Sequence, residues 1–192
     1  GVVFADADLD QVMDIIYGNR FTNCGQMCDA LKRLIVHESV FNKVLERLKK
    51  KLESLKVGDP EKETTDIGPL VAKRQLELLE LQVKDALDKG AKILIGGRRP
   101  KKLHGAYYEP TILTNISKDM RVWQEEVFGP VLPVVTFNTD DEAIKMANDT
   151  KYGLGSHVYT RDKKKAVEIA SEIEAGMVSV NTASYNKPCS PF

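Results

Sequence analysis

Apolar positions along the chain follow two spacings. Between residues 8 and 19 they recur at helical intervals, as at Leu9, Val12 and Ile16, and Asp8 is available to cap the start. The same periodicity predicts helices over residues 8–19, 39–55, 71–89, 140–148 and 163–174. Short apolar runs between them predict strands over residues 34–36, 92–95, 110–113, 131–137, 156–160 and 177–181.

Helical and strand-like segments alternate along most of the chain. Strands separated by helices of this length are joined by crossover connections, which give parallel pairs. Glycine and proline end the predicted helices, at Gly58-Asp-Pro60 after one helix and at Gly90 after the next. A length of 192 residues suits one core. We therefore predict one α/β domain with a largely parallel sheet flanked by helices.

Composition and charge narrow the partners that the chain would bind. The 28 basic and 28 acidic side chains cancel, so no net field draws the protein to nucleic acid. The longest apolar runs are too short to cross a bilayer. Three cysteines without paired spacing, and the lack of a secretory leader, predict a reducing compartment, taken here as the cytoplasm. We predict no nucleic-acid, membrane or metal partner.

Residues 21–28, Phe-Thr-Asn-Cys-Gly-Gln-Met-Cys, form the first candidate site. This polar, turn-forming run lies between a predicted helix and a predicted strand, where attacking side chains are commonly placed. Cysteine is also among the most buried residue types, so an inert core thiol is the competing interpretation. Cys24 and Cys28 are four apart, but no second pair of cysteines or histidines follows to complete a zinc site.

Residues 119–133 form the second candidate site. The run Trp123-Gln-Glu-Glu-Val-Phe-Gly-Pro130 combines paired carboxylates with two large aromatic side chains and a Gly-Pro stop. A binding loop is one interpretation. The other is structural: Trp123 and Phe128 fill the edge of a core while Glu125 and Glu126 face water.

Several motifs together resemble the NAD(P)-dependent aldehyde dehydrogenase superfamily. Asn23-Cys-Gly-Gln-Met-Cys28 is similar to the family's Asn-x-Gly-Gln-x-Cys pattern, and Glu126-Val-Phe-Gly-Pro130 to its Glu-x-Phe-Gly-Pro motif. Further similarities lie at Tyr152-Gly-Leu154, Val180-Asn181 and Ser190-Pro-Phe192. Ordered motifs spread from end to end are hard to obtain by chance. The resemblance implies a three-layer, aldehyde dehydrogenase-like catalytic domain over residues 1–192.

The resemblance also implies a role for individual residues. Cys28 becomes the catalytic nucleophile, whereas Cys24 occupies a variable position. Glu126 matches the glutamate that holds a ribose of the nicotinamide cofactor, and Phe128 the aromatic near its nicotinamide end. Asn181 matches a position beside the substrate pocket, with a structural or lining role.

The chemistry implied by the resemblance is oxidation of a small aldehyde to a carboxylic acid with NAD or NADP. The Cys28 thiolate adds to the aldehyde to give a thiohemiacetal, hydride leaves to the cofactor, and water hydrolyses the resulting thioester. Semialdehydes, lactaldehyde and phosphorylated glyceraldehyde all remain open as substrates. The cofactor is held largely by a separate domain in the family, which also decides between NAD and NADP.

Other parts that the resemblance implies have no counterpart in these 192 residues. They are the family's catalytic glutamate, its upstream cofactor-binding domain and its C-terminal oligomerisation strand. We therefore expect a catalytic domain that has little dehydrogenase activity by itself. The family's oligomers imply a parent protein that is a homodimer or homotetramer.

Two other function classes stay open from the sequence. One is a non-enzymatic binding or structural domain on the same scaffold. The other is a cysteine hydrolase, which would need a histidine partner for the thiol. His37 and His157 lie at the edges of apolar strand runs, where a structural imidazole is expected, and His104 lies in a basic loop. We expect a structural or incidental role for Cys189.

Overall fold

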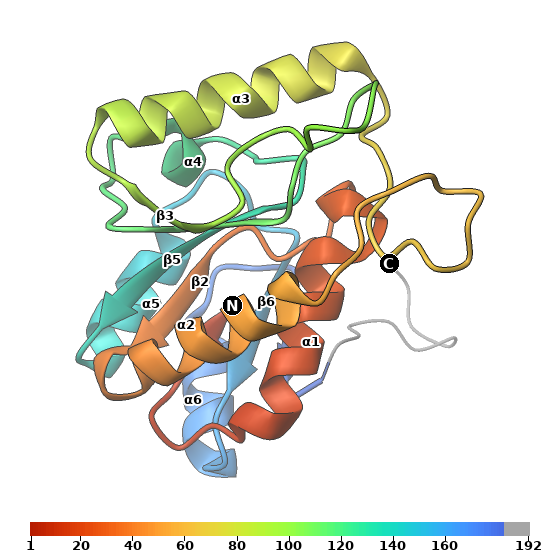
Figure 1. Cartoon of the computed structure of the whole chain (residues 1–192). Helices are drawn as coiled ribbons and strands as arrows, with labels where there is room; N and C mark the ends of the chain where they lie inside the picture. Colours follow the sequence, from red (N-terminus) through yellow and green to blue (C-terminus); the bar gives the residue numbers. More distant parts are fainter. Residues whose placement is uncertain (183–192) are drawn as a thin grey trace.

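A computed structural model describes residues 1–182, which form a seven-stranded sheet with helices on both faces (Figure 1). The strand order across the sheet is β3-β4-β5-β2-β1-β6-β7. The strands are β1 (Val2–Val3), β2 (Leu34–His37), β3 (Lys92–Ile95), β4 (Thr111–Thr114), β5 (Val131–Phe137), β6 (Gly155–Tyr159) and β7 (Met177–Val180).

Helices lie in every connection between consecutive strands of residues 1–182 except the one between β3 and β4. The α-helices are α1 (Leu9–Phe21), α2 (Glu38–Glu53), α3 (Lys73–Asp88), α4 (Arg121–Gln124), α5 (Asp140–Asn148) and α6 (Lys163–Glu172), and the 3₁₀-helix η1 spans Thr22–Gly25. All five helices and all six strands that the apolar spacing predicts are present, with ends shifted by up to two residues. Asp8 caps α1 as expected, accepting hydrogen bonds from the backbone N–H groups of Asp10 and Gln11.

The sheet is largely parallel, which confirms the prediction from crossover connections. Strands β4, β5, β2, β1, β6 and β7 pair in parallel, and only the β3–β4 pair at one edge is antiparallel within residues 1–182. Strand β2 lies near the middle, and Leu34, Ile35 and Val36 are fully buried because both faces of the sheet are covered.

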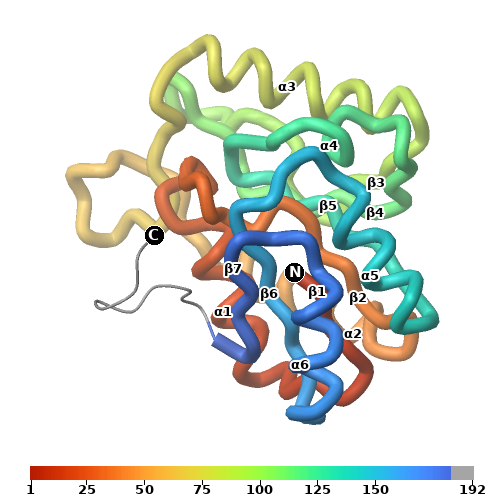
Figure 2. Tube along the Cα trace, turned by 180° about the vertical axis from the view of Figure 1, so that it is seen from behind, coloured from red at the N-terminus to blue at the C-terminus, as the bar shows by residue number. Residues whose placement is uncertain are grey.

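Alternate residues of the central strands point into two separate cores. Val3 and Val36 pack toward α1, α2 and α3, whereas Val2 and Ile35 pack toward α5 and α6. Figures 1 and 2, drawn from opposite sides, show the two helical layers in turn. The result is the three-layer α/β arrangement that the family resemblance implies.

Three short elements were not predicted. Strand β1 is two residues long, so its alternation is too brief to detect, yet it joins the two parts of the sheet through β2 and β6. Helix α4 is a single turn inside the segment that we interpreted as a loop. The helix η1 contains left-handed backbone at Asn23 and Cys24, which no helical periodicity encodes.

Candidate active site

A cavity of about 290 Å³ brings the two candidate segments together. Cys28, Glu126 and Phe128 all line it, although they lie far apart in sequence. The segments that line it lead directly into β2, β5, β6 and β7. The cavity therefore lies at the amino ends of these parallel strands, whereas open α/β sheets usually bind ligands at the carboxyl ends.

Residues 22–31, called the cysteine segment from here on, hold their shape largely through their own backbone. Asn23, Cys24 and Gly25 have φ values of 50°, 57° and 68°, so three successive residues are left-handed. A Cβ atom on Gly25 would lie 2.5 Å from the carbonyl oxygen of Gly129, so no other residue fits there. The side chains of Asn23 and Gln26 each donate to the other's backbone carbonyl oxygen.

The two cysteines of this segment have opposite environments. Cys28 is exposed at the cavity. Cys24 is 5% exposed, and its thiol donates to the carbonyl oxygen of Gly68 at 3.0 Å. Burial raises the pKa of the Cys24 thiol to about 11, so it stays protonated at neutral pH. This geometry supports a structural Cys24 and an accessible Cys28.

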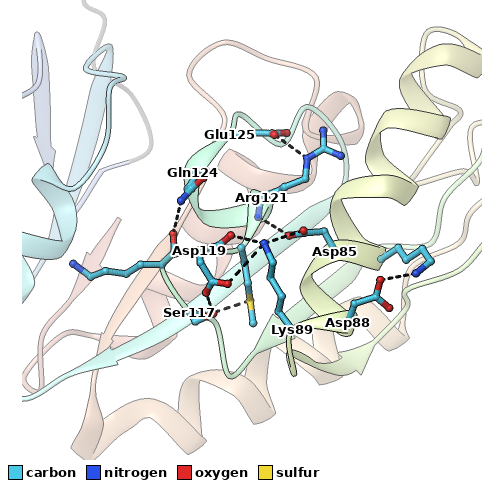
Figure 3. Close-up of polar contacts among 11 residues, drawn as sticks. Asp85, Asp88, Lys89, Ser117, Asp119, Arg121, Gln124 and Glu125 are labelled. Carbon is cyan, nitrogen blue, oxygen red and sulfur yellow. Dashed lines mark hydrogen bonds and ion pairs between the residues drawn. The ribbon is translucent and has the colours of Figure 1, made fainter.

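Residues 125–130, called the glutamate segment from here on, are anchored beside α3 and α4. Figure 3 shows the ion pairs: Lys89 contacts Asp85 at 2.9 Å, and Arg121 contacts Glu125 at 2.8 Å. Asp85 also accepts the backbone N–H of Arg121, and Gln82 donates to Glu125 at 2.9 Å. The hydrogen bond from Arg121 lowers the pKa of Glu125 below its usual value.

The structural interpretation of this segment is therefore only partly right. Trp123 does fill the core, with its indole N–H donating to Asp149 at 3.0 Å. Glu125 is half-buried in the ion-pair network, while Glu126 alone is exposed. Phe128 is half-buried and lines the cavity. The two neighbouring glutamates thus differ, and Glu126 is the one available to a ligand.

Two basic side chains, four and five residues after Cys28, also line the cavity. Lys32 places its ammonium 4.0 Å from the centre of the Tyr152 ring, with no hydrogen-bond partner among residues 1–182. Burial, and next the charge of Arg33, lower the pKa of Lys32 to about 7. Arg33 donates to the carbonyl oxygens of Asp149 and Trp123. These contacts of Lys32 and Arg33 do not involve the Cys28 sulfur.

Asn181 lies outside this cavity. Its side-chain amide donates to the carbonyl oxygen of Thr160 at 2.7 Å, and its side-chain oxygen accepts the backbone N–H of Thr160 at 3.1 Å. Its φ of 52° is left-handed, which asparagine tolerates. Of the two roles that the resemblance implies for Asn181, the structural one fits these contacts.

The histidines offer no base for a cysteine hydrolase among the described residues. His157 lines the cavity, but its ring nitrogens lie 2.6 Å from the Ser179 hydroxyl and 3.2 Å from the Asn19 amide. Burial lowers the pKa of His157 to about 3. His37 caps α2 through Nδ1, and His104 is exposed. Cys189 lies outside the described residues.

Comparison with known proteins shows which family the chain belongs to. A family model described as "Aldehyde dehydrogenase family" matches residues 1–192. The chain belongs to the aldehyde dehydrogenase family. Two similar curated relatives are the peroxisomal aminoaldehyde dehydrogenase 1 of Pisum sativum, 46% identical over 95% of this chain, and the chloroplastic betaine aldehyde dehydrogenase of Beta vulgaris, 43% identical over 98%.

Solved structures of aldehyde dehydrogenases share this fold. The succinate-semialdehyde dehydrogenase of Burkholderia pseudomallei superposes with a TM-score of 0.96 over the whole chain at 36% identity. The betaine aldehyde dehydrogenase of Staphylococcus aureus, in complex with NAD+, superposes with a TM-score of 0.91 over 94% of the chain at 35% identity. The chain covers 36% and 37% of the two plant relatives, and 39% and 36% of these two structures.

Some residues around this cavity were not identified as site residues from the sequence. Tyr152 was noted only as part of a motif, and Lys32 was not connected with it. Arg20 is 1% exposed and also lines the cavity. A signal for Arg20 did exist, because it follows Ile16 by four residues and Met13 by seven, on the buried face of α1. A cation on such a face marks a residue with a specific partner.

In the part of the chain that the structure describes, no helix is long and apolar enough to span a membrane.

Proposed function

We propose that this chain carries the nucleophile of an NAD(P)-dependent aldehyde dehydrogenase that oxidises a small aldehyde to its carboxylic acid. The observation that supports this most is the meeting of Cys28, Glu126 and Phe128 around one cavity. Each of the three was assigned a role from motif resemblance alone. Their convergence from two segments that are distant in sequence is what such chemistry requires.

Cys28 is the proposed nucleophile. Its exposed thiol, once ionised, attacks the aldehyde carbon and forms a carbon–sulfur bond, and the carbonyl oxygen becomes the alkoxide of a thiohemiacetal. The backbone N–H of Cys28 is a proposed donor to that oxygen. Release of the acid requires a thioester at Cys28 and its hydrolysis by water. The neighbouring Cys24 thiol, protonated and bonded to Gly68, does not compete.

Glu126 and Phe128 are the proposed cofactor-binding residues. The exposed carboxylate of Glu126 suits a ribose hydroxyl, and the half-buried ring of Phe128 offers an apolar surface to a flat heterocycle. A nicotinamide cofactor, when bound, supplies the hydride acceptor. NAD and NADP both remain candidates; among related structures, one is described as a complex with NAD+ and another as a complex with NAP.

The remaining proposals concern the whole protein. We propose residues 1–192 as its catalytic domain, with cofactor binding largely through residues outside this chain, so that the chain alone has little dehydrogenase activity. We propose a cytoplasmic homodimer or homotetramer as the parent protein. The substrate is proposed only as a small aldehyde. The names of relatives include aminoaldehyde, betaine aldehyde and 3-sulfolactaldehyde dehydrogenases.

Brief labelling with substoichiometric iodoacetamide tests the nucleophile in this chain directly. We expect peptide mapping to find the label on Cys28 well before Cys24, because Cys28 is exposed and Cys24 is buried. Propionaldehyde should slow this labelling at lower concentration than it slows labelling of N-acetylcysteine, since the cavity holds the aldehyde beside the thiol.

Cys24→Ser is the matched control and should leave the rate of Cys28 labelling and its slowing by propionaldehyde unchanged, whereas Cys28→Ser should abolish both. Two results would count against a preformed aldehyde site. One is equal labelling of the two cysteines, and the other is that propionaldehyde slows labelling of Cys28 and of N-acetylcysteine at the same concentration. The non-enzymatic domain would then be the better proposal.

A further inference from the structure

The glutamate segment has an unusual set of anchors. Its residues 126–129 form neither helix nor strand, yet each of their four carbonyl oxygens accepts a hydrogen bond from a side chain elsewhere in the chain. The donors are Arg20 on α1 and Gln75 and Gln82 on α3. The bonds run from Gln82 to Glu126 (3.1 Å), from Arg20 to Val127 (2.9 Å) and to Gly129, and from Gln75 to Phe128 (2.7 Å).

Arg20 differs from the two glutamines because it also holds the cysteine segment. One guanidinium nitrogen donates to the carbonyl oxygen of Leu31 at 3.2 Å, while the other donates to Val127 and Gly129. The planar guanidinium holds its donors in a fixed fork, so the carbonyl groups that it binds are held at a set spacing. One side chain therefore spans the two segments that carry Cys28 and Glu126.

The backbones of the two segments also touch beside this guanidinium. Gly25 lies so close to Gly129 that an added Cβ would come within 2.5 Å of the Gly129 carbonyl oxygen and 2.7 Å of that of Arg20. Gly129 is closed on its other side by Leu79 of α3, 2.8 Å from where its own Cβ would lie. A displacement of the glutamate segment would therefore be transmitted to the cysteine segment.

Burial makes this arrangement costly for a charged group. Arg20 is 1% exposed, and its Nε has no hydrogen-bond partner among residues 1–182. Burial lowers its pKa to about 9, and the charge of Glu126 acts in the opposite direction. The guanidinium thus interacts electrostatically with Glu126 and also binds the backbone of the segment that carries Glu126.

We infer that Arg20 is a positioning residue, whose guanidinium sets the distance between the segment carrying Cys28 and the segment carrying Glu126 and Phe128. The contacts of Arg20 are independent of the proposed function. Only the role that we assign to them, to position Cys28 relative to Glu126 and Phe128, rests on that function. Arg20 acts through the backbone and touches no reacting atom.

The test uses Arg20→Met, which keeps an unbranched apolar stem and removes the donors, and Arg20→Lys, which keeps the charge but loses the fork. Ile169→Ala is the control, because Ile169 is 4% exposed and packs in the core on the other face of the sheet. Each variant is measured at a temperature equally far below its own Tm, so that global stability is matched.

Two measurements are made on the chain itself. Hydrogen–deuterium exchange of residues 126–131 should accelerate about tenfold in Arg20→Met, because local opening becomes easier. The ratio of Cys28 to Cys24 labelling by iodoacetamide should fall, because a loosened cysteine segment exposes the buried Cys24. Arg20→Lys should change both in the same direction by a smaller factor, and Ile169→Ala should change neither.

A match between Arg20→Met and Ile169→Ala in either measurement overturns the inference. If Arg20→Met does not fold, Arg20→Lys decides by the same criteria. Neither measurement needs an aldehyde or a nicotinamide cofactor, so the inference can fail while the proposed function stands, and the reverse.

Discussion

The cysteine segment and the glutamate segment meet at one cavity, but different forces hold them. The cysteine segment is shaped mainly from within, by left-handed backbone at residues 23–25 and by the reciprocal bonds between Asn23 and Gln26. The glutamate segment is held from outside, by long side chains of α1 and α3 that bind its carbonyl oxygens. A site can thus combine a locally encoded half with a half that exists only in the folded protein.

The largest expected effect comes from breaking the locally encoded half at Gly25. Gly25→Ala combines a positive φ with a steric collision at the Gly129 carbonyl oxygen, so we expect a loss of about 3 kcal/mol in the free energy of unfolding. Urea denaturation measures it. Gly18→Ala in α1 is the matched control, since its Cβ would meet nothing within 4 Å, and it should stabilise by roughly 0.5–1 kcal/mol. Equal effects of the two would show that the close approach at Gly25 is not required.

A pH titration of stability tests whether Cys24 helps to hold the same segment. The pKa of Cys24 rises from 9.0 when unfolded to about 11 when folded, so its protonated thiol stabilises the protein fully below pH 9. That contribution is lost as the pH rises from 9 to 11, because the unfolded thiol ionises first.

The free energy of unfolding of the unmodified chain, minus that of Cys24→Ala, should therefore fall by up to about 2 kcal/mol across this window. Taking the difference removes the titration of tyrosines and lysines, which both proteins share. A difference that stays constant from pH 9 to 11 would contradict a buried, hydrogen-bonded Cys24.

The smallest of these effects is expected at an anchor of the glutamate segment. Gln82→Met removes the donor to Glu125 and to the Glu126 carbonyl oxygen, and should cost about 1 kcal/mol by urea denaturation. The loss is modest because Gln82→Met also removes the side-chain oxygen, which has no hydrogen-bond partner among residues 1–182. Gln124→Met, at an exposed glutamine, should change stability by less than about 0.5 kcal/mol. Indistinguishable variants would mean that Gln82 is not an anchor.

The same difference between the segments explains what could be predicted from sequence. Helices and strands follow from apolar spacing, and the cysteine segment follows from local turn-forming residues, so both were found. The assignment of Glu126 and Phe128 needed a family resemblance, because two adjacent glutamates look alike in a sequence. Glu125 differs from Glu126 through its contacts with Arg121, four residues earlier in α4, and with Gln82 of α3.

The anchors themselves were harder to predict. The sequence does indicate Arg20, because it places a cation on the buried face of α1. Gln82 gives a similar but weaker indication, because it follows Leu79 by three residues on the buried face of α3. Gln75 gives none, because a glutamine in an amphipathic helix normally indicates a solvated face. The hydrogen bonds of Asn181 could not be predicted either, because the position of its partner Thr160 depends on how β6 and β7 pair.

Anchoring through carbonyl oxygens has a consequence for how this site can change. Every residue type offers the same carbonyl group, so the donors at residues 20, 75 and 82 hold the path of the chain whatever side chains residues 126–128 present. Mutational libraries at positions 126 and 128 should therefore retain folded members at high frequency. Selection, natural or in the laboratory, can therefore change the side chains at these two proposed cofactor-binding positions without first rebuilding the scaffold beneath them.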